Sequence, residues 1–339
     1  MDISDFDYDL PPELIAQTPL PRRDDSRLLV VERHSGCLRH HSFRDLPSLL
    51  KPGDVIVFND SRVLPARLRA HKPTGGKVEL LLVEPRADGT WSALTRPGLP
   101  RGAIVYIGDS EPSLPIEVIG LSDSGLRIVR TLEGMSVATL LAEYGELPTP
   151  PYIHRRLSDP SRYQTIYARE NGSIAAPTAG LHFTEEILEQ LDQRQVEIQY
   201  LTLHVGIGTF TPVRVQEVAR HHMHEEHFTL SEPVARALER AKRTGRRIIA
   251  VGTTTTRALE SAWHDGGLRT GIQSTSLFIT PGFQFHVIDA LVTNFHLPRS
   301  TLLMLVSAFT GHKLIMRAYH EAISQRYRFY SFGDAMFIT

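Results

Sequence analysis

Five polar segments of the sequence carry the residue types that enzymes use for proton transfer and ligand binding. They lie where an apolar strand is expected to end or a helix to begin, which is where open α/β sheets bind ligands. The segments are AAPTAGLHF (175–183), TLHVGIGTF (202–210), HHMHEEH (221–227), VGTTTTRALES (251–261) and TNFHLPRST (293–301). All but the fourth contain histidine, and the chain has 16 histidines in 339 residues.

Histidine titrates close to neutral pH, so it can accept and return a proton during catalysis. His221 and His224 would share one face if their segment were helical, because they are three residues apart. Which group acts as the base stays open at this point. The catalytic candidates are the histidines of these segments and nearby carboxylates: His204, His221, His224, His296, Asp60 and Glu225, with Asp334 as a further alternative.

The segment HHMHEEH also has the side chains of a metal site, because imidazole and carboxylate groups bind zinc and iron. Its spacing is not H-E-x-x-H, and the single cysteine, Cys37, cannot form a multi-cysteine site. We therefore expect no metal. A metal-dependent hydrolase built on this segment is the alternative function, and histidines without a chemical role are the third interpretation.

Glycine, threonine and asparagine in the same segments are the candidates for ligand binding. A glycine lets a ligand approach the backbone, and hydroxyl and amide groups at a helix N-terminus bind anions. One of the threonines in 253–256 is expected to cap the following helix, and a purely structural role in turns and caps is the alternative. The candidates are Thr178, Gly180, His182, Gly206, Gly208, Thr209, Phe210, Gly252, Thr253, Thr254 and Asn294.

Basic residues are concentrated in two places, although the net charge of the chain is only -1. Nucleic acid is bound by a local surface, so overall neutrality does not exclude it. Arginine with neighbouring aromatic rings can pair phosphates and stack on RNA bases, whereas a solvated helix face is the alternative explanation. The RNA-binding candidates are Arg236, Arg240, Arg243, Arg246 and Arg247 in one group and Arg326, Arg328 and Tyr330 in the other.

Two different sequence patterns predict the elements that position these residues. Residues 1–64 and 150–339 alternate helical and strand patterns, which predicts an α/β (mixed α+β) domain. Six short apolar runs separated by Gly, Pro and Asp turns fill residues 65–149 and predict a small antiparallel β-barrel inserted into it. Within the α/β part we expect, among other elements, helices at 160–168 and 257–264 and a strand at 276–279.

The start of the sequence is acidic and lacks the basic and apolar regions of a secretory signal. The longest apolar stretch, 302–309, is far below the ~20 residues that cross a bilayer. A single cysteine is typical of a reducing compartment. We therefore expect a cytoplasmic protein without a membrane partner.

In order along nearly the whole chain, these segments resemble the tRNA ribosyltransferase-isomerases of queuosine biosynthesis. The resemblance is weakest beyond Leu82 in the β-rich part, and Thr149 and His286 replace an expected leucine and lysine. Besides the five segments, it rests on LPPELIAQTP (10–19), GDVIVFNDSRVLPARL (53–68), TGGKVELLL (74–82), PPYIHR (150–155), RYQTIYA (162–168), FITPGFQF (278–285) and YRFYSFGDAMFI (327–338).

The resemblance implies a fold, a reaction and partners. The family uses S-adenosylmethionine as ribosyl donor and 7-aminomethyl-7-deazaguanine at the wobble position of tRNAs for Asn, Asp, His and Tyr as acceptor. The implied products are epoxyqueuosine-tRNA, adenine and methionine. A metal-free monomer with an α/β domain and an inserted β-barrel is expected, with the target base leaving its stack in the anticodon loop.

Overall fold

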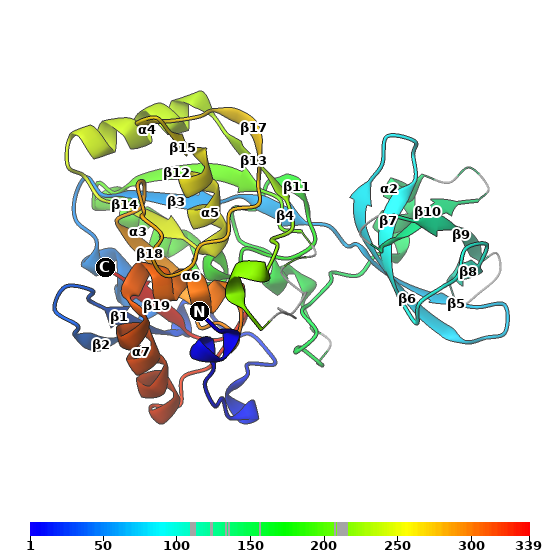
Figure 1. Ribbon diagram of the computed structural model, residues 1–339, viewed down its shortest axis with the longest axis horizontal. Coiled ribbons are helices and arrows are strands. Elements are labelled where there is room, and N and C mark those ends of the chain that lie inside the picture. Colours follow the sequence, from blue (N-terminus) through cyan, green and yellow to red (C-terminus); the bar gives the residue numbers. More distant parts are fainter. Residues whose placement is uncertain are drawn as a thin grey trace. The chain divides into compact units, whose positions relative to one another are not determined.

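The computed structural model describes residues 1–108, 113–122, 125–132, 134, 136–155, 157–206, 208 and 216–339. The chain divides into two units (Figure 1): Met1–Arg62 with Pro150–Thr339, and Val63–Thr149. The first unit is mixed α/β and the second contains a closed antiparallel barrel, which confirms the expected fold class. No helix in the described residues is long and apolar enough to span a membrane.

A nine-stranded sheet forms the larger unit, in the order β17-β13-β12-β3-β14-β18-β19-β1-β2. Strands β12, β3, β14 and β18 are parallel, whereas β19 and β1 run antiparallel to β18. The strands are β1 (Arg27–Val31), β2 (Leu38–Ser42), β3 (Val55–Asn59), β12 (Glu197–Leu203), β13 (Glu226–Leu230), β14 (Ile248–Val251), β17 (Gly271–Thr275), β18 (Ala290–Asn294) and β19 (Ala335–Ile338).

Helices cover both faces of this sheet (Figure 1), so its central strands are continuous apolar runs. Alternate residues of β3 enter the two cores: Val55 and Val57 one, Ile56 and Phe58 the other. The first core is completed by α4 (Glu232–Arg243), α5 (Thr253–Ala262), α6 (Thr301–Thr310) and α7 (His312–Ser324), and the second by α1 (Leu46–Leu49) and α3 (Glu185–Gln193).

Short elements connect these layers. The 3₁₀ helices are η1 (Ile3–Phe6), η2 (Pro12–Leu14), η3 (Arg23–Asp25), η4 (Phe43–Asp45), η5 (Pro160–Tyr163), η6 (Thr178–His182) and η8 (Val218–Arg220). The remaining strands outside the barrel are β4 (Ser61–Val63), β11 (Glu170–Ser173), β15 (Trp263–His264) and β16 (Gly267–Leu268).

The smaller unit is a six-stranded barrel closed in the order β10-β7-β6-β5-β8-β9. Closure removes the exposed edges of a sheet. Leu68, Leu80, Val105 and Val118 are buried in it. Its elements are β5 (Arg67–His71), β6 (Lys77–Pro85), β7 (Trp91–Arg96), β8 (Ile104–Ile107), β9 (Leu114–Leu121), β10 (Arg127–Thr131) and α2 (Val137–Tyr144), whose first turn Ser136 caps.

Three expected elements differ in the structure. The helix expected at 160–168 is only η5, because the residues that follow include β-branched and aromatic side chains that favour helices poorly. Helix α5 begins at Thr253, and its N-cap is Gly252 rather than a threonine, since Thr255 and Thr256 bond back to the carbonyls of Val251 and Gly252. The edge strand β17 ends at Thr275, so residues 276–279 are not a strand.

Candidate functional site

The carboxyl ends of four parallel strands share one edge of the large sheet, which we call the site edge. Register places Asn59 of β3 beside Leu201 of β12, and Val251 of β14 beside Val292 of β18. Strands β19 and β1 begin at the same edge, because Asn294 pairs with Ala335, and Ala335 pairs with Leu28. Polar residues from distant parts of the sequence therefore meet there.

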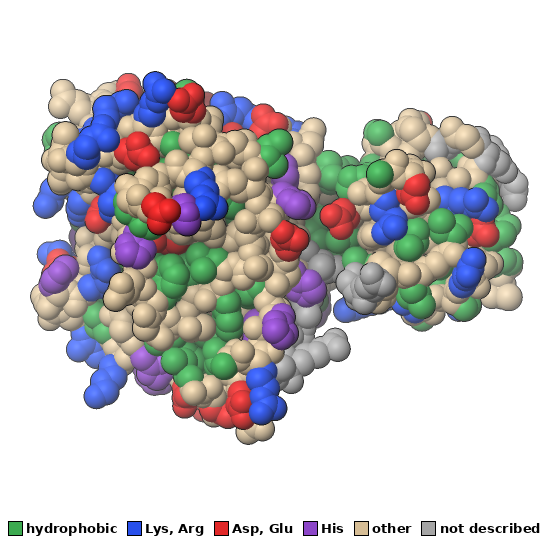
Figure 2. All heavy atoms as spheres, turned by 45° about the horizontal axis from the view of Figure 1, so that its top comes forward, with side chains coloured by type: hydrophobic (Ala, Val, Ile, Leu, Met, Phe, Trp, Pro, Cys, Tyr) green, Lys and Arg blue, Asp and Glu red, His purple; other side chains and the backbone are tan. Residues whose placement is uncertain are grey.

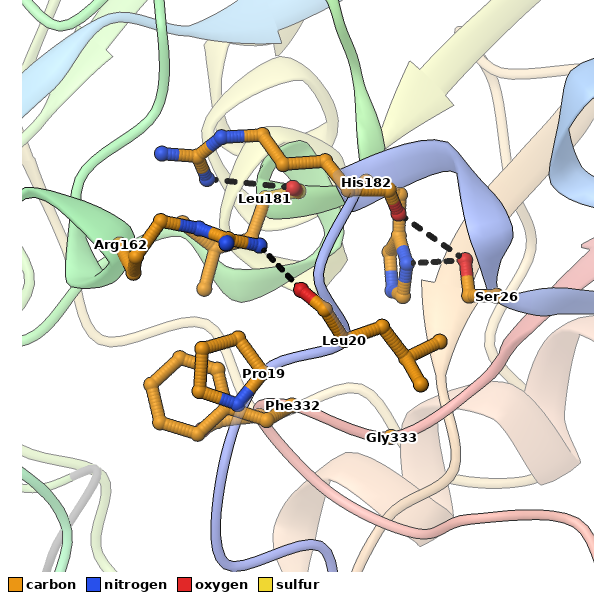
Figure 3. A pocket seen from close by; sticks show the side chains of 10 residues that line it. Pro19, Leu20, Ser26, Arg162, Leu181, His182, Phe332 and Gly333 are labelled. Atoms are coloured by element: carbon orange, nitrogen blue, oxygen red, sulfur yellow. Dashed lines mark hydrogen bonds between the residues drawn. The ribbon is translucent and has the colours of Figure 1, made fainter. Parts of the chain in front are cut away.

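His182 is held at the site edge by a chain of hydrogen bonds. Its Nε2 accepts from Asn294 Nδ2 over 3.0 Å, so Nδ1 carries the proton and donates to Ser26 Oγ over 2.7 Å. Figure 3 shows the bond to Ser26. Asn294 Oδ1 in turn accepts from Thr178 Oγ1 over 2.9 Å. Phe43 stacks on the imidazole at 5.0 Å. Both ring nitrogens are thus occupied, so His182 positions its neighbours and is not a free base.

His296 lies deeper, after the end of β18. Its Nε2 is 2.8 Å from Thr293 Oγ1, its backbone N–H donates to Tyr319 Oη over 2.8 Å, and its carbonyl accepts from the Tyr8 hydroxyl. Burial lowers the pKa of His296 to about 3. Burial, with Arg23 and Arg328 nearby, also lowers the pKa of His182 to about 3. Both imidazoles are neutral at neutral pH.

These two histidines predict a loss of stability in acid. Their folded pKa lies below the ordinary value of 6.5, so below pH 6.5 the unfolded chain takes up protons that the folded chain refuses. Stability should therefore fall as the pH drops from 6.5 toward 3, with unfolding taking up about one extra proton per histidine. Urea unfolding between pH 7 and pH 5 measures this. The variant His182→Gln with His296→Gln should show a flatter dependence, whereas replacing the exposed His222 should not.

A second polar group surrounds the end of β3. Asp60 is 6% exposed, and its carboxylate accepts hydrogen bonds from Arg169 Nη2 at 2.9 Å and Thr202 Oγ1 at 2.7 Å. The Asn59 side chain bridges to β12 through the backbone carbonyl and N–H of Leu203. These bonds fix the end of β12 against β3, and with it the residue that follows.

That residue is His204, which is partly buried directly after β12. Burial lowers its pKa, which Glu170 and Asp60 partly offset. Its Nδ1 is buried and has no hydrogen-bond partner among the described residues. A Cβ on Gly172 would lie 2.6 Å from this Nδ1, so only glycine leaves room for the ring. His204 is a neutral imidazole whose proton-accepting capacity the described part of the chain does not use fully.

The candidate glycines differ in what surrounds them. A Cβ on Gly180 would come within 2.0 Å of the Tyr167 hydroxyl, which gives this glycine a packing role. Gly252 has φ +91°, a conformation that side chains resist. Gly206 donates its N–H to Glu226 Oε1 at 3.0 Å. A Cβ on Gly206 would make only ordinary contact, with the Glu226 side chain at 3.7 Å. Gly208 lies against His224.

Two further ligand-binding candidates, Thr209 and Phe210, lie outside the described residues. Thr253 and Thr254 occupy the first turn of α5, and no side chain of the described residues caps that turn. The first N–H groups of a helix point out of its N-terminus, here at the site edge, where an acceptor can meet them.

The histidine-rich segment does not form one helical face, since η8 ends at Arg220 and β13 begins at Glu226. His221 packs edge-on against Phe278 at 5.2 Å, and His224 and Glu225 are exposed. Glu226 is buried and forms an ion pair with Arg257. Over the described residues, no three His, Cys, Asp or Glu side chains are arranged to hold a metal ion.

Three of the five arginines in the first group of basic candidates form ion pairs with acidic residues. Arg236 pairs with Glu232, Arg246 with Glu197, and Arg247 with Asp54. Arg246 and Arg247 come just before β14, at the sheet edge opposite the site edge. Arg240 and Arg243 are exposed on α4 and form no ion pair in the described part of the chain. Figure 2 shows basic and acidic side chains interspersed over this face.

The second group lies close to His182. The Tyr330 carbonyl accepts from Asn294 Nδ2 at 3.3 Å, while its own ring is 4% exposed and packs against Tyr152. Arg326 is exposed, and Arg328 donates to the carbonyl of Thr18. Asp334 accepts the backbone N–H of Arg328 at 2.8 Å and pairs with Arg27, so its carboxylate is fully engaged.

Sequence reasoning missed several residues of the site edge. Ser26, Arg23 and Arg162 line a pocket with His182, and Arg257 and Glu226 hold the backbone of Gly206. Glu226 and Arg257 lie within two of the five polar segments, but no spacing in the sequence shows that they pair. Ser26, Arg23 and Arg162 lie outside those segments, and the pairing of β1 and β19 with β18 brings Ser26 to the site edge.

The fold and the site edge together define an α/β protein with a β-barrel unit and a group of polar side chains at the ends of parallel strands. The chain belongs to the family described as queuosine biosynthesis protein, whose profile matches residues 3–338.

Individual relatives resemble the chain over its full length. An S-adenosylmethionine:tRNA ribosyltransferase-isomerase of Symbiobacterium thermophilum is 52% identical, with 100% of both chains covered. The protein of the same name from Clostridioides difficile is 48% identical with the same coverage. A crystal structure of S-adenosylmethionine tRNA ribosyltransferase from Thermotoga maritima shares 38% identity and a TM-score of 0.59, covering 99% of this chain and 100% of that one. None of these names indicates a metal-dependent hydrolase.

Proposed function

We propose that this chain is a transferase that moves the ribosyl group of S-adenosylmethionine to tRNA and isomerises it, as a step of queuosine biosynthesis. The observation that carries the proposal is the match of relatives bearing this name over the whole chain. The neutral imidazoles and uncapped amides at the site edge supply the groups that such a reaction needs.

The finer assignment follows from the resemblance in the sequence. The acceptor is the exocyclic amine of 7-aminomethyl-7-deazaguanine at the wobble position of tRNAs for Asn, Asp, His and Tyr. The products are epoxyqueuosine-tRNA, adenine and methionine. We further propose that the enzyme is a cytoplasmic monomer and uses no metal.

His204 is the proposed general base. The sulfonium of S-adenosylmethionine acidifies the adjacent ribose carbon, and a base must remove that proton to begin the rearrangement. A neutral imidazole at the site edge suits this step, and because Nδ1 is buried against Gly172, Nε2 is the nitrogen proposed to take the proton. Asp60 lies within electrostatic range of His204, and its charge stabilises the imidazolium that forms. His296 and His182 are already hydrogen-bonded and remain neutral.

The uncapped first turn of α5 is the proposed site for the carboxylate of S-adenosylmethionine. Backbone N–H groups at a helix N-terminus attract anions, and the hydroxyl of Thr254 lies in the same turn. Gly206 and Gly252 keep side chains away from this edge, so the donor can lie against backbone. Departing adenine needs a proton donor, and hydroxyl and amide groups can also stabilise negative charge that develops on the ribose oxygen.

Mass spectrometry of tRNA tests the proposed function directly. Wobble-precursor tRNA incubated with the protein and S-adenosylmethionine should gain the mass of the epoxycyclopentane group, with one adenine released for each modified tRNA. An unmodified tRNA and no free adenine would contradict the proposal. Stoichiometric zinc or iron in the purified protein, together with hydrolase activity, would support the metal-dependent alternative instead.

A further inference from the structure

The pocket beside His182 gathers positive charge. Its polar lining includes Arg23, Arg162, Ser26 and Ser331. Leu20, Leu181 and Phe332 supply apolar walls, and Figure 3 shows Arg162 hydrogen-bonded to the Leu20 carbonyl. All of these residues belong to the larger unit.

The two arginines of the pocket donate only to backbone carbonyls. Arg23 reaches the carbonyls of Leu181 at 3.2 Å and Ser161 at 3.1 Å. Arg162 reaches those of Leu20 at 2.8 Å and Pro21 at 3.0 Å. Its Nε is buried without a partner in the described part of the chain, where neither guanidinium forms an ion pair. Both side chains are therefore fixed in place, and the carboxylate in their electrostatic range, Asp159, forms no direct ion pair with either.

Arg328 adds a third cation near the same histidine. Its Nη1 is buried and has no partner among the described residues, and its Nη2 donates to the Thr18 carbonyl. Burial lowers the pKa of Arg23 and of Arg328, and Arg162 lowers that of Arg23 further. Removing cations from water without an anion is unfavourable, so such a cluster is stabilised when an anion enters.

The charge of the pocket selects the anion. Guanidinium groups match phosphate and carboxylate oxygens. S-adenosylmethionine carries a sulfonium and an ammonium against one carboxylate, so three nearby arginines repel it. A phosphodiester carries a negative charge and no cation.

We propose that Arg23 and Arg162, with Arg328 beside them, bind one phosphodiester group of the tRNA close to the wobble nucleotide. This assignment rests on the proposed function. The location follows from His182, which lines the pocket and also hydrogen-bonds to Asn294 at the site edge. The bound phosphate fixes the register of the RNA, so that the acceptor amine meets the ribosyl donor at the ends of β12 and β14.

Binding measurements at several salt concentrations test this role. Arg23→Gln with Arg162→Gln should raise the tRNA Kd about tenfold or more. The slope of log Kd against log salt should fall by about 0.7–0.9 for the lost contact. The KM for S-adenosylmethionine should stay unchanged. Arg39→Gln is the matched control, because Arg39, on β2, is exposed and forms an ion pair with Glu32.

Neutral RNA linkages test the same contact in the unmodified protein. Anticodon stem–loops carrying one methylphosphonate each should show one position, near the wobble nucleotide, that weakens binding to wild type and is silent in the double variant. A rise in KM for S-adenosylmethionine with unchanged RNA binding would assign the pocket to the donor and overturn the proposal. So would the absence of any such position. Wild-type protein that releases no adenine would contradict the proposed function. If the wild type is active and the double variant binds tRNA as tightly as the wild type, only the phosphate pocket is contradicted.

Discussion

His204→Gln is expected to slow single-turnover release of adenine by roughly 10²–10⁴-fold, the usual effect of losing a general base. Glutamine approximates the size of imidazole but cannot take up the proton, so tRNA affinity and thermal stability should change little. Rapid quenching of enzyme–tRNA complexes mixed with S-adenosylmethionine gives the rate. In wild type, this rate should decline in acid as His204 becomes protonated. The midpoint of the decline should lie below pH 6.5, the ordinary pKa of histidine, because burial lowers the pKa of His204.

His296→Gln and His224→Gln are the comparison variants for His204. His296 is fully enclosed and bonded to Thr293, so its loss should lower stability more than the rate. His224 is exposed beside Gly208, and its replacement should have little effect on stability. Near wild-type turnover by His204→Gln would remove it as the base and turn attention to His221, Glu225 or Asp60.

Arg257→Met is expected to destabilise the protein by about 3–5 kcal/mol, because it leaves the buried carboxylate of Glu226 without its cation. Both side chains are only 5–6% exposed, and Arg257 also donates to the Leu277 carbonyl at 3.0 Å. Glu226 holds the N–H of Gly206 as well, so the segment after β12 should loosen and ligand binding should weaken with it. Urea and thermal unfolding measure the loss.

Two further variants separate charge from packing at this pair. Arg257→Met combined with Glu226→Gln should recover much of the lost stability, because the amide is neutral and still accepts from Gly206. Arg236→Met is the surface control, since its partner Glu232 is exposed and such pairs contribute about 0–1 kcal/mol. A loss in Arg257→Met no larger than in this control would show that the buried pair is not critical.

Sequence patterns predict best those elements whose apolar residues follow a short repeat within the element itself. The turn-separated strands of the barrel are evident because strand burial leaves a short-range signature. Strand β19 was missed, since four residues carry little pattern and its partners, β1 and β18, lie far away in sequence. Strand β13 was obscured because its first residues overlap the histidine-rich segment.

The polar segments of the candidate site were recognisable, but the contacts between them were not. Thr178, His182 and Asn294 were singled out by residue type, and the structure joins them in one hydrogen-bonded chain. Ser26 completes that chain only because β1 lies two strands from β18. The roles of Arg23 and Arg162 depend on their meeting at one pocket from segments far apart in sequence, which no spacing in a sequence encodes.

The place of β19 in the sheet also constrains how the protein is made. This strand lies between β18 and β1, so residues near 335–338 separate the first strand of the chain from the rest of the sheet. During synthesis, the β1–β2 hairpin must wait, without its neighbour, until almost all of the chain has left the ribosome. The barrel is built from one continuous segment and can fold long before that. The flank of β1 therefore stays unpaired until β19 has been made.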